Sequence, residues 1–148
     1  MSRLRRARVH VLSVQDMDGD AQTTELVADG ALLQTASGVR VTYSHGENGA
    51  YLRTTVETVG SREVRVRHSG DVRSELVFEA GAAHETPYET PYGVLPLRIF
   101  TESVENAWGD GGGELRFAYA LTFPGQAPVR TRVRLLVETQ GTGEKNDV

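Results

Sequence analysis

The chain contains no cysteine and only one lysine, and both shortages restrict its chemistry. Without cysteine it has no thiol nucleophile, disulfide, iron–sulfur ligand or thiolate zinc site. The one lysine, Lys145, lies in a polar tail, so a Schiff-base or lysine-base mechanism has no suitable residue. The sequence therefore gives no reason to expect a catalytic residue, a metal or a cofactor.

Long apolar runs are also missing. Arg3, Arg5, Arg6 and Arg8 make the N-terminus basic, but no run of signal-peptide or membrane-spanning length follows them. The formal net charge of −4 differs from the basic balance typical of nucleic-acid binders. We therefore expect a cytoplasmic protein that does not bind a membrane. The sequence does not indicate an oligomeric state.

Helical periodicity is missing as well, because apolar residues alternate with polar ones almost everywhere. The clearest runs are residues 114–123 and 129–137, where arginines such as Arg130, Arg132 and Arg134 occupy every second position. Turn residues separate the runs, as at 36–38, 109–113 and 124–125. This pattern predicts an all-β fold, either an antiparallel sandwich or a barrel, with roughly eight to ten strands. We expect a single antiparallel up-and-down β-barrel, because closure leaves no strand edge unpaired. One domain over residues 1–140 and a disordered polar tail over residues 141–148 are expected.

Four motifs point to a known family. One is a doubled Glu-Thr-Pro-Tyr unit that ends in Tyr88-x-Thr90-x-Tyr92-Gly93. The others are residues 64–70 followed by Leu76, Phe78 and Gly81, then Thr101-x-x-Val104, and the alternating run 113–121. Together they resemble the DUF1934 family, the YwiB-like proteins, over about residues 9–138. The resemblance implies a barrel of lipocalin (calycin-like) type and no established activity.

One position departs from that family. The family tends to place an arginine two residues before the glycine that ends the motif at residues 64–70, where this chain has His68. If that arginine binds a shared ligand or forms an ion pair, then in this chain either His68 has replaced it or Arg67 performs its role.

Three local motifs resemble metal or phosphate sites without completing them. A calcium loop starting at Asp16 would need glycine and glutamate where Ala21 and Val27 stand. The glycine-rich residues 109–113 precede a predicted strand, so they lack the helix N-terminus that a phosphate loop uses. The four histidines have no metal-ligand spacing, and Pro87 prevents a zinc helix from starting at His84.

The remaining candidates are polar and aromatic side chains that a barrel interior would bring together. An eight-stranded barrel either fills its interior or holds one small ligand. We expect a binding module for a small amphipathic or anionic molecule, without catalysis. The candidate residues that line the interior are Tyr43, His68, Tyr88, Tyr92, Arg98 and Tyr119.

Two alternatives stay open. A filled barrel would instead bind protein or RNA through the outer arginines Arg130, Arg132 and Arg134, and an exposed Trp108 would favour this case. A cofactor-free lyase or isomerase would use tyrosine and arginine to polarise a substrate, and His68 or a buried glutamate to move a proton.

Overall fold

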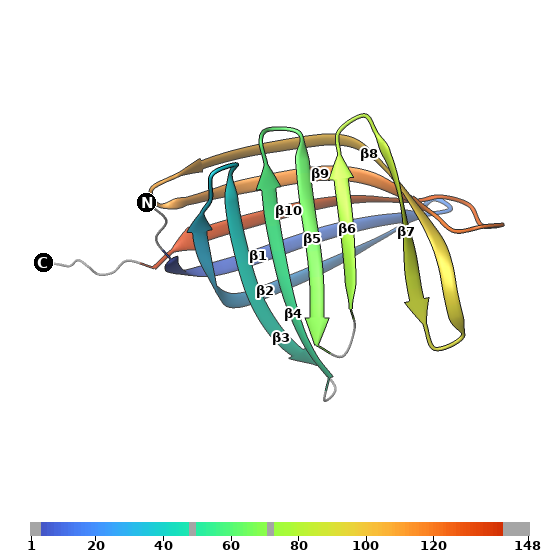
Figure 1. Ribbon diagram of the computed structural model, residues 1–148, viewed down its shortest axis with the longest axis horizontal. Helices are drawn as coiled ribbons and strands as arrows, with labels where there is room; N and C mark the ends of the chain where they lie inside the picture. The colour runs from blue at the N-terminus through green and yellow to red at the C-terminus, as the bar shows by residue number, and fades with distance from the viewer. Residues whose placement is uncertain (1–3, 48–49, 71–72, 141–148) are drawn as a thin grey trace, which may run out of the picture.

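The computed structural model describes residues 4–47, 50–70 and 73–140, and these form one antiparallel sheet of ten strands (Figure 1). The tail predicted over residues 141–148 lies outside the described residues. The strands are β1 (Leu4–Met17), β2 (Asp20–Gln34), β3 (Val39–Glu47), β4 (Ala50–Val59), β5 (Glu63–Gly70), β6 (Ser74–Glu79), β7 (Ala83–Thr90), β8 (Gly93–Gly109), β9 (Gly112–Thr122) and β10 (Val129–Thr139). Among the described residues, no helix has the length and hydropathy needed to cross a membrane.

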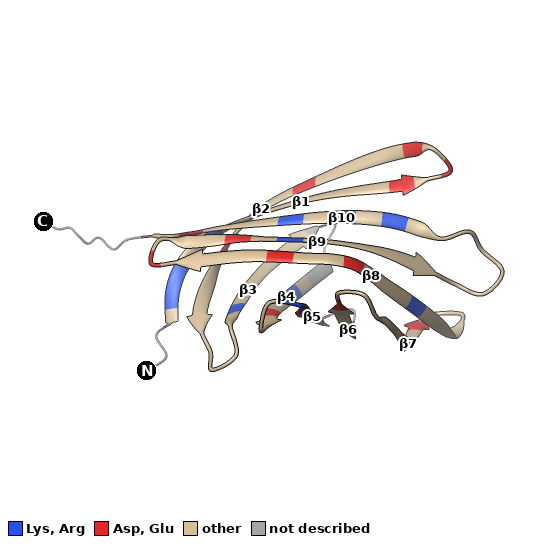
Figure 2. Cartoon of the chain, turned by 90° about the horizontal axis from the view of Figure 1, so that it is seen from above, with Lys and Arg blue, Asp and Glu red and all other residues tan. Residues whose placement is uncertain are grey.

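The strand order makes the sheet a nearly closed barrel. It runs β6-β5-β4-β3-β2-β1-β10-β9-β8-β7, so the first and last strands pair in the middle. In Figure 1 the strands β1, β2, β8, β9 and β10 run along the long axis, and β3 to β7 cross them. Seen from above, the two groups form opposite walls (Figure 2). The predicted all-β antiparallel barrel is confirmed.

The remaining edges, β6 and β7, meet only at one end. Ala80 forms an isolated bridge to Thr101, and the Gly81 amide donates to the Thr101 carbonyl at 2.8 Å. His84 Nε2 lies 3.0 Å from Glu79 Oε1 across the same seam. Pro87 lies in the middle of β7 and removes one backbone donor, which suits an unpaired edge.

Alternation along the strands decides which side chains face inward. The chain starts and ends at one end of the barrel, called here the terminal end. The β1–β2, β3–β4, β5–β6, β7–β8 and β9–β10 connections lie at the other, the distal end. The core is formed by buried inward residues, and those that are at most 2% exposed include Val9, Val41, Val64, Ile99, Leu115, Leu135 and Val137. Most of them lie towards the terminal end.

Candidate functional site

Towards the distal end, inward side chains remain partly exposed although they pack against the core. These partly buried residues are Val11, Leu26, Ala28, Leu76, Tyr88, Tyr119, Leu121, Phe123 and Val133. Solvent therefore reaches this part of the interior, which we call the open half.

Three aromatic rings form the floor of the open half. Phe78 reaches from β6 to the opposite wall, where its ring centroid lies 4.9 Å from that of Phe117 and 4.6 Å from that of Tyr119. The Phe117 and Tyr119 rings, both on β9, are stacked at 5.8 Å. Because Phe78 is only 2% exposed, this cluster separates the dry core from the open half.

A row of hydrogen-bonding side chains crosses one wall of the open half. The strand register places Tyr43 opposite Thr54, Thr54 opposite His68, and His68 opposite Ser74, on four consecutive strands. We call these four residues the polar row. His68 Nδ1 lies 3.0 Å from Ser74 Oγ. Tyr43 and Thr54 are buried, while His68 and Ser74 are half-buried.

Burial controls the ionisation of these groups. Burial raises the pKa of Tyr43, and a hydrogen bond with Thr54 offsets part of that rise. Burial and then repulsion from His45 lower the pKa of His68, which favours a neutral imidazole at pH 7. The polar row therefore presents uncharged donors and acceptors.

His45 extends the polar row by one step towards the distal end. It lies on the same face of β3 as Tyr43, two residues along, and the half-buried ring is close enough to His68 to affect its pKa. Its Nδ1 atom is buried and has no hydrogen-bond partner among the described residues. Within those residues, no group of three or more His, Cys, Asp or Glu side chains is arranged to hold a metal.

The facing wall contributes Tyr119 and Thr101. Burial raises the pKa of Tyr119, and the neighbouring Thr131 hydroxyl offsets part of the rise. Thr101 lies opposite Tyr119 in the β8–β9 ladder, and its buried hydroxyl has no partner in the described part of the chain. Tyr88 packs edge-on against Phe123 at 6.0 Å and lies at the margin of the open half.

Four of the six predicted lining residues thus share the interior, namely Tyr43, His68, Tyr88 and Tyr119. The prediction that Tyr92 and Arg98 also line the interior is wrong. Tyr92 occupies the β7–β8 turn and is 98% exposed, because β7 ends at Thr90. Arg98 lies between the inward Leu97 and Ile99, so it faces outward, 3.9 Å from Glu85.

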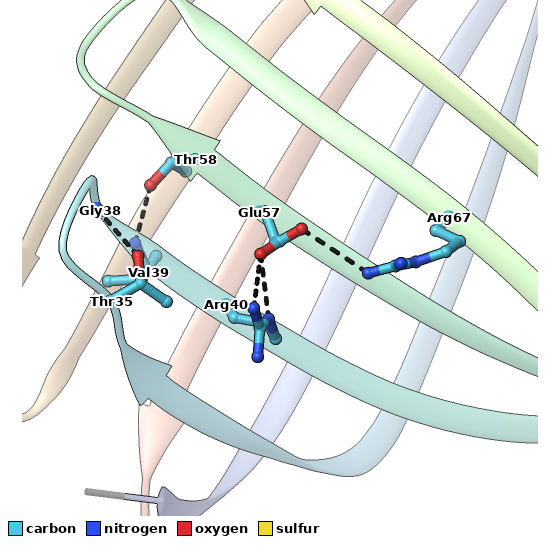
Figure 3. Close-up of polar contacts among 7 residues, drawn as sticks. All are labelled: Thr35, Gly38, Val39, Arg40, Glu57, Thr58 and Arg67. Carbon is cyan, nitrogen blue, oxygen red and sulfur yellow. Dashed lines mark hydrogen bonds and ion pairs between the residues drawn. The ribbon is translucent and has the colours of Figure 1, made fainter. Parts of the chain in front are cut away.

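Arg67 does not place a positive charge in the interior either. Its guanidinium lies 3.7 Å from Glu57 Oε1 on the outer face, and Arg40 binds the other oxygen of the same carboxylate through two nitrogens (Figure 3). The interior therefore has His68, and no arginine, at the position where this chain departs from the family that it resembles.

The outer arginines mostly pair with acidic neighbours. Arg134 Nε donates to Glu114 at 2.8 Å, and Arg130 lies 4.0 Å from Glu102. Arg132 has no acidic partner among the described residues. It lines a shallow groove of about 320 Å³ whose other residues include Leu12, Val14 and Arg134.

The sequence interpretation missed His45, Thr54 and Ser74. Alternation places His45 on the same face as Tyr43, so this residue had a signal in the sequence. Thr54 and Ser74 enter the polar row through the register between strands, which one sequence does not reveal.

The fold and site define a class, a ten-stranded antiparallel barrel with a partly open interior. The domain of unknown function DUF1934 matches residues 9–135, and the chain belongs to this family. A curated relative, the "Uncharacterized beta-barrel protein YwiB" of Bacillus subtilis (strain 168), is 28% identical over 111 residues, covering 75% of this chain and 78% of that protein.

A solved structure has the same fold. It is the crystal structure of the ywiB protein from Bacillus subtilis, with a TM-score of 0.77 and 23% identity, covering 93% of this chain and 94% of that chain. The family resemblance deduced from the four motifs is thereby confirmed.

Proposed function

We propose that this protein binds a small amphipathic molecule in the open half of the barrel, without catalysing its conversion. The observation that carries the proposal is a row of hydrogen-bonding side chains set into an apolar inner surface that is partly exposed. Ligand sites commonly combine a mainly apolar lining with a few convergent polar groups.

The polar row favours an uncharged head group, such as a hydroxyl or an amide. Neutral histidine both donates and accepts a hydrogen bond, and His45 Nδ1 is buried without a partner in the described chain. Among the described inward positions of the open half that are buried or half-buried, none holds an arginine, lysine, aspartate or glutamate to compensate a buried ionic group. This narrows the earlier expectation of an amphipathic or anionic ligand to the amphipathic one.

The apolar body of the ligand would lie on the partly exposed side chains of the same half. Leu26, Leu121 and Val133 contribute to this surface. Covering them removes apolar area from water, which is the main source of affinity for such a ligand. The Phe78 ring cluster limits how deeply the ligand enters.

A thermal-shift titration with three ten-carbon probes tests the proposal. Decanol and decanamide should stabilise the protein, whereas decanoate at pH 7.5 should do so much less. At a hundred times its dissociation constant a ligand stabilises by about 2.7 kcal/mol, which for a chain of this size corresponds to roughly 5–10 °C.

Two histidine variants locate the binding. His68→Leu should greatly reduce the shift caused by decanol. His10→Leu is the matched control, because His10 faces outward and contacts Glu25 at 2.5 Å. Equal shifts in both variants, or no shift with either uncharged probe, would exclude binding at the polar row.

A second candidate is an RNA or protein partner on the outer face at Arg130, Arg132 and Arg134. The groove beside Arg132 supports it, since this guanidinium has no acidic partner among the described residues. Binding of a short RNA would weaken as salt rises and would be lost in Arg132→Gln. Binding that is unaffected by Arg132→Gln would remove this candidate. A cytoplasmic location remains a prediction from the sequence.

A further inference from the structure

A second recess lies at the terminal end of the barrel, opposite the open half. Its volume is about 510 Å³. We call it the terminal recess, and the residues that line it include Arg5, Leu32, Gln34, Val39, Trp108 and Asp110. Leu32 and Val39 are buried and form its apolar floor, above the dry core.

The turn between β2 and β3 holds one wall of the recess in place. Thr35 Oγ1 accepts a hydrogen bond from the Gly38 amide at 3.1 Å, and Thr58 Oγ1 accepts one from the Val39 amide at 3.0 Å (Figure 3). Gly38 fits closely against Thr58, because a Cβ atom there would lie 2.3 Å from the Thr58 hydroxyl. The floor and Gln34 therefore lie on a fixed hairpin.

The opposite wall is formed by the end of β8 and the start of β1. Trp108 packs on Gly113, where an added Cβ would lie 2.6 Å from the indole ring. Arg5, opposite Leu32 in the β1–β2 ladder, donates a hydrogen bond to the main-chain carbonyl of Asp110. Both side chains are thus oriented by backbone contacts.

Two residues that line the recess, Arg5 and Trp108, have N–H groups without an acceptor among the described residues. Trp108 Nε1 is buried and has no acceptor among the described residues. An indole N–H only donates, and a buried one usually has a partner. A guanidinium carries five N–H groups, and the Asp110 carbonyl occupies one nitrogen of Arg5. Two donors beside an apolar floor are complementary to a carboxylate on a flat apolar body.

We propose that the terminal recess is a second binding site, one that takes a small carboxylate. The carboxylate contacts the Arg5 guanidinium and Trp108 Nε1, and the apolar body covers Leu32 and Val39. Planar carboxylates match the guanidinium fork better than other anions of this size, because two parallel hydrogen bonds form. This site is independent of the binding proposed for the open half.

Trp108 makes the site observable by itself, because it is the only tryptophan in the chain. Its indole N–H gives one resonance in a two-dimensional ¹H–¹⁵N NMR spectrum of the full-length protein. Benzoate is the probe, and benzamide, which has the same ring without the charge, is the matched control. We expect benzoate to move the indole resonance saturably, with at least about tenfold higher affinity than benzamide.

Variants assign the effect to Arg5. Arg5→Gln should lower the affinity for benzoate by about tenfold or more. Arg5→Lys keeps the charge but loses the planar guanidinium, so its affinity should lie between those of the unchanged protein and Arg5→Gln. Arg8→Gln, a change at an outward arginine that pairs with Asp29, should leave the affinity unchanged. The backbone resonances in the same spectra report whether each variant is folded.

Three results would overturn the proposal. They are an indole resonance that benzoate does not move saturably, equal affinities for benzoate and benzamide, and unchanged benzoate affinity in folded Arg5→Gln.

Discussion

Replacing Phe78 by alanine tests whether one ring joins the two walls of the barrel. Phe78 is 2% exposed, and its ring contacts Phe117 and Tyr119 on the facing strand. Removing a buried phenylalanine ring typically costs about 3–5 kcal/mol. The loss of two aromatic pairs, each about 0.5–1.5 kcal/mol beyond area burial, places the expected loss near the top of that range.

Urea denaturation measures this loss as a change in the free energy of unfolding. A loss of about 4–5 kcal/mol is large against a typical total of 5–15 kcal/mol, and it corresponds to roughly 8–20 °C in melting temperature. Phe78→Leu keeps most of the side-chain volume and should lower the free energy of unfolding by roughly 1–2 kcal/mol. This variant can still be measured if Phe78→Ala does not fold.

Phe100→Ala is the matched control for this experiment. Phe100 lies on the outer face of β8 and is 42% exposed, so its removal should cost less than about 1 kcal/mol. Equal losses for Phe78→Ala and Phe100→Ala would refute the assignment of Phe78 to the floor of the open half.

Three further predictions concern the backbone, the pH response and the margin of the open half. Gly38→Ala should lower the free energy of unfolding by about 1–3 kcal/mol in urea denaturation, because the added Cβ would clash with Thr58. Gly109→Ala is the control and should be neutral, since Gly109 has open space around it. Equal effects of the two substitutions would contradict the close approach of Gly38 to Thr58. Because the pKa of His68 is lowered below 6.5, the unfolded state binds more protons, and the free energy of unfolding should fall as pH drops below 6.5 towards the folded pKa. Denaturation across that range should show a smaller decline in His68→Gln, and an identical decline would exclude His68 as its source. Tyr88→Ala should lower the melting temperature more than Tyr88→Phe, since the ring packs against Phe123; similar decreases would show that the ring contributes little.

Alternation in the sequence predicted the strands and the all-β class, and the family resemblance supported the barrel. Residues 113–121 and 129–137 alternate so regularly that both strands and their inward faces follow from it, and β9 and β10 match them. Tyr43, His68 and Tyr119 face inward for the same reason.

The two errors arose where local structure interrupts the alternation or a face was misassigned. Tyr92 was predicted to line the interior together with Tyr88, but Pro91 and Tyr92 form the turn between β7 and β8, so Tyr92 projects into solvent. Arg98 lies between Leu97 and Ile99, which the structure buries, and strand alternation therefore places Arg98 on the outer face.

The terminal recess could not be deduced from one sequence. Arg5 and Trp108 are far apart in the chain, and they meet because β1 pairs with β10 and β10 with β9, which in turn pairs with β8. Long-range strand order of this kind depends on closure of the barrel, and local patterns do not encode it.

The most direct test of ligand binding in the open half is a methyl NMR titration with decanol. We predict saturable shifts at the leucines of the open half, Leu26, Leu76 and Leu121, and none at the buried core residues Leu115 and Leu135. An absence of shifts at these three leucines, or shifts confined to outward residues such as Leu12, would contradict binding inside the barrel.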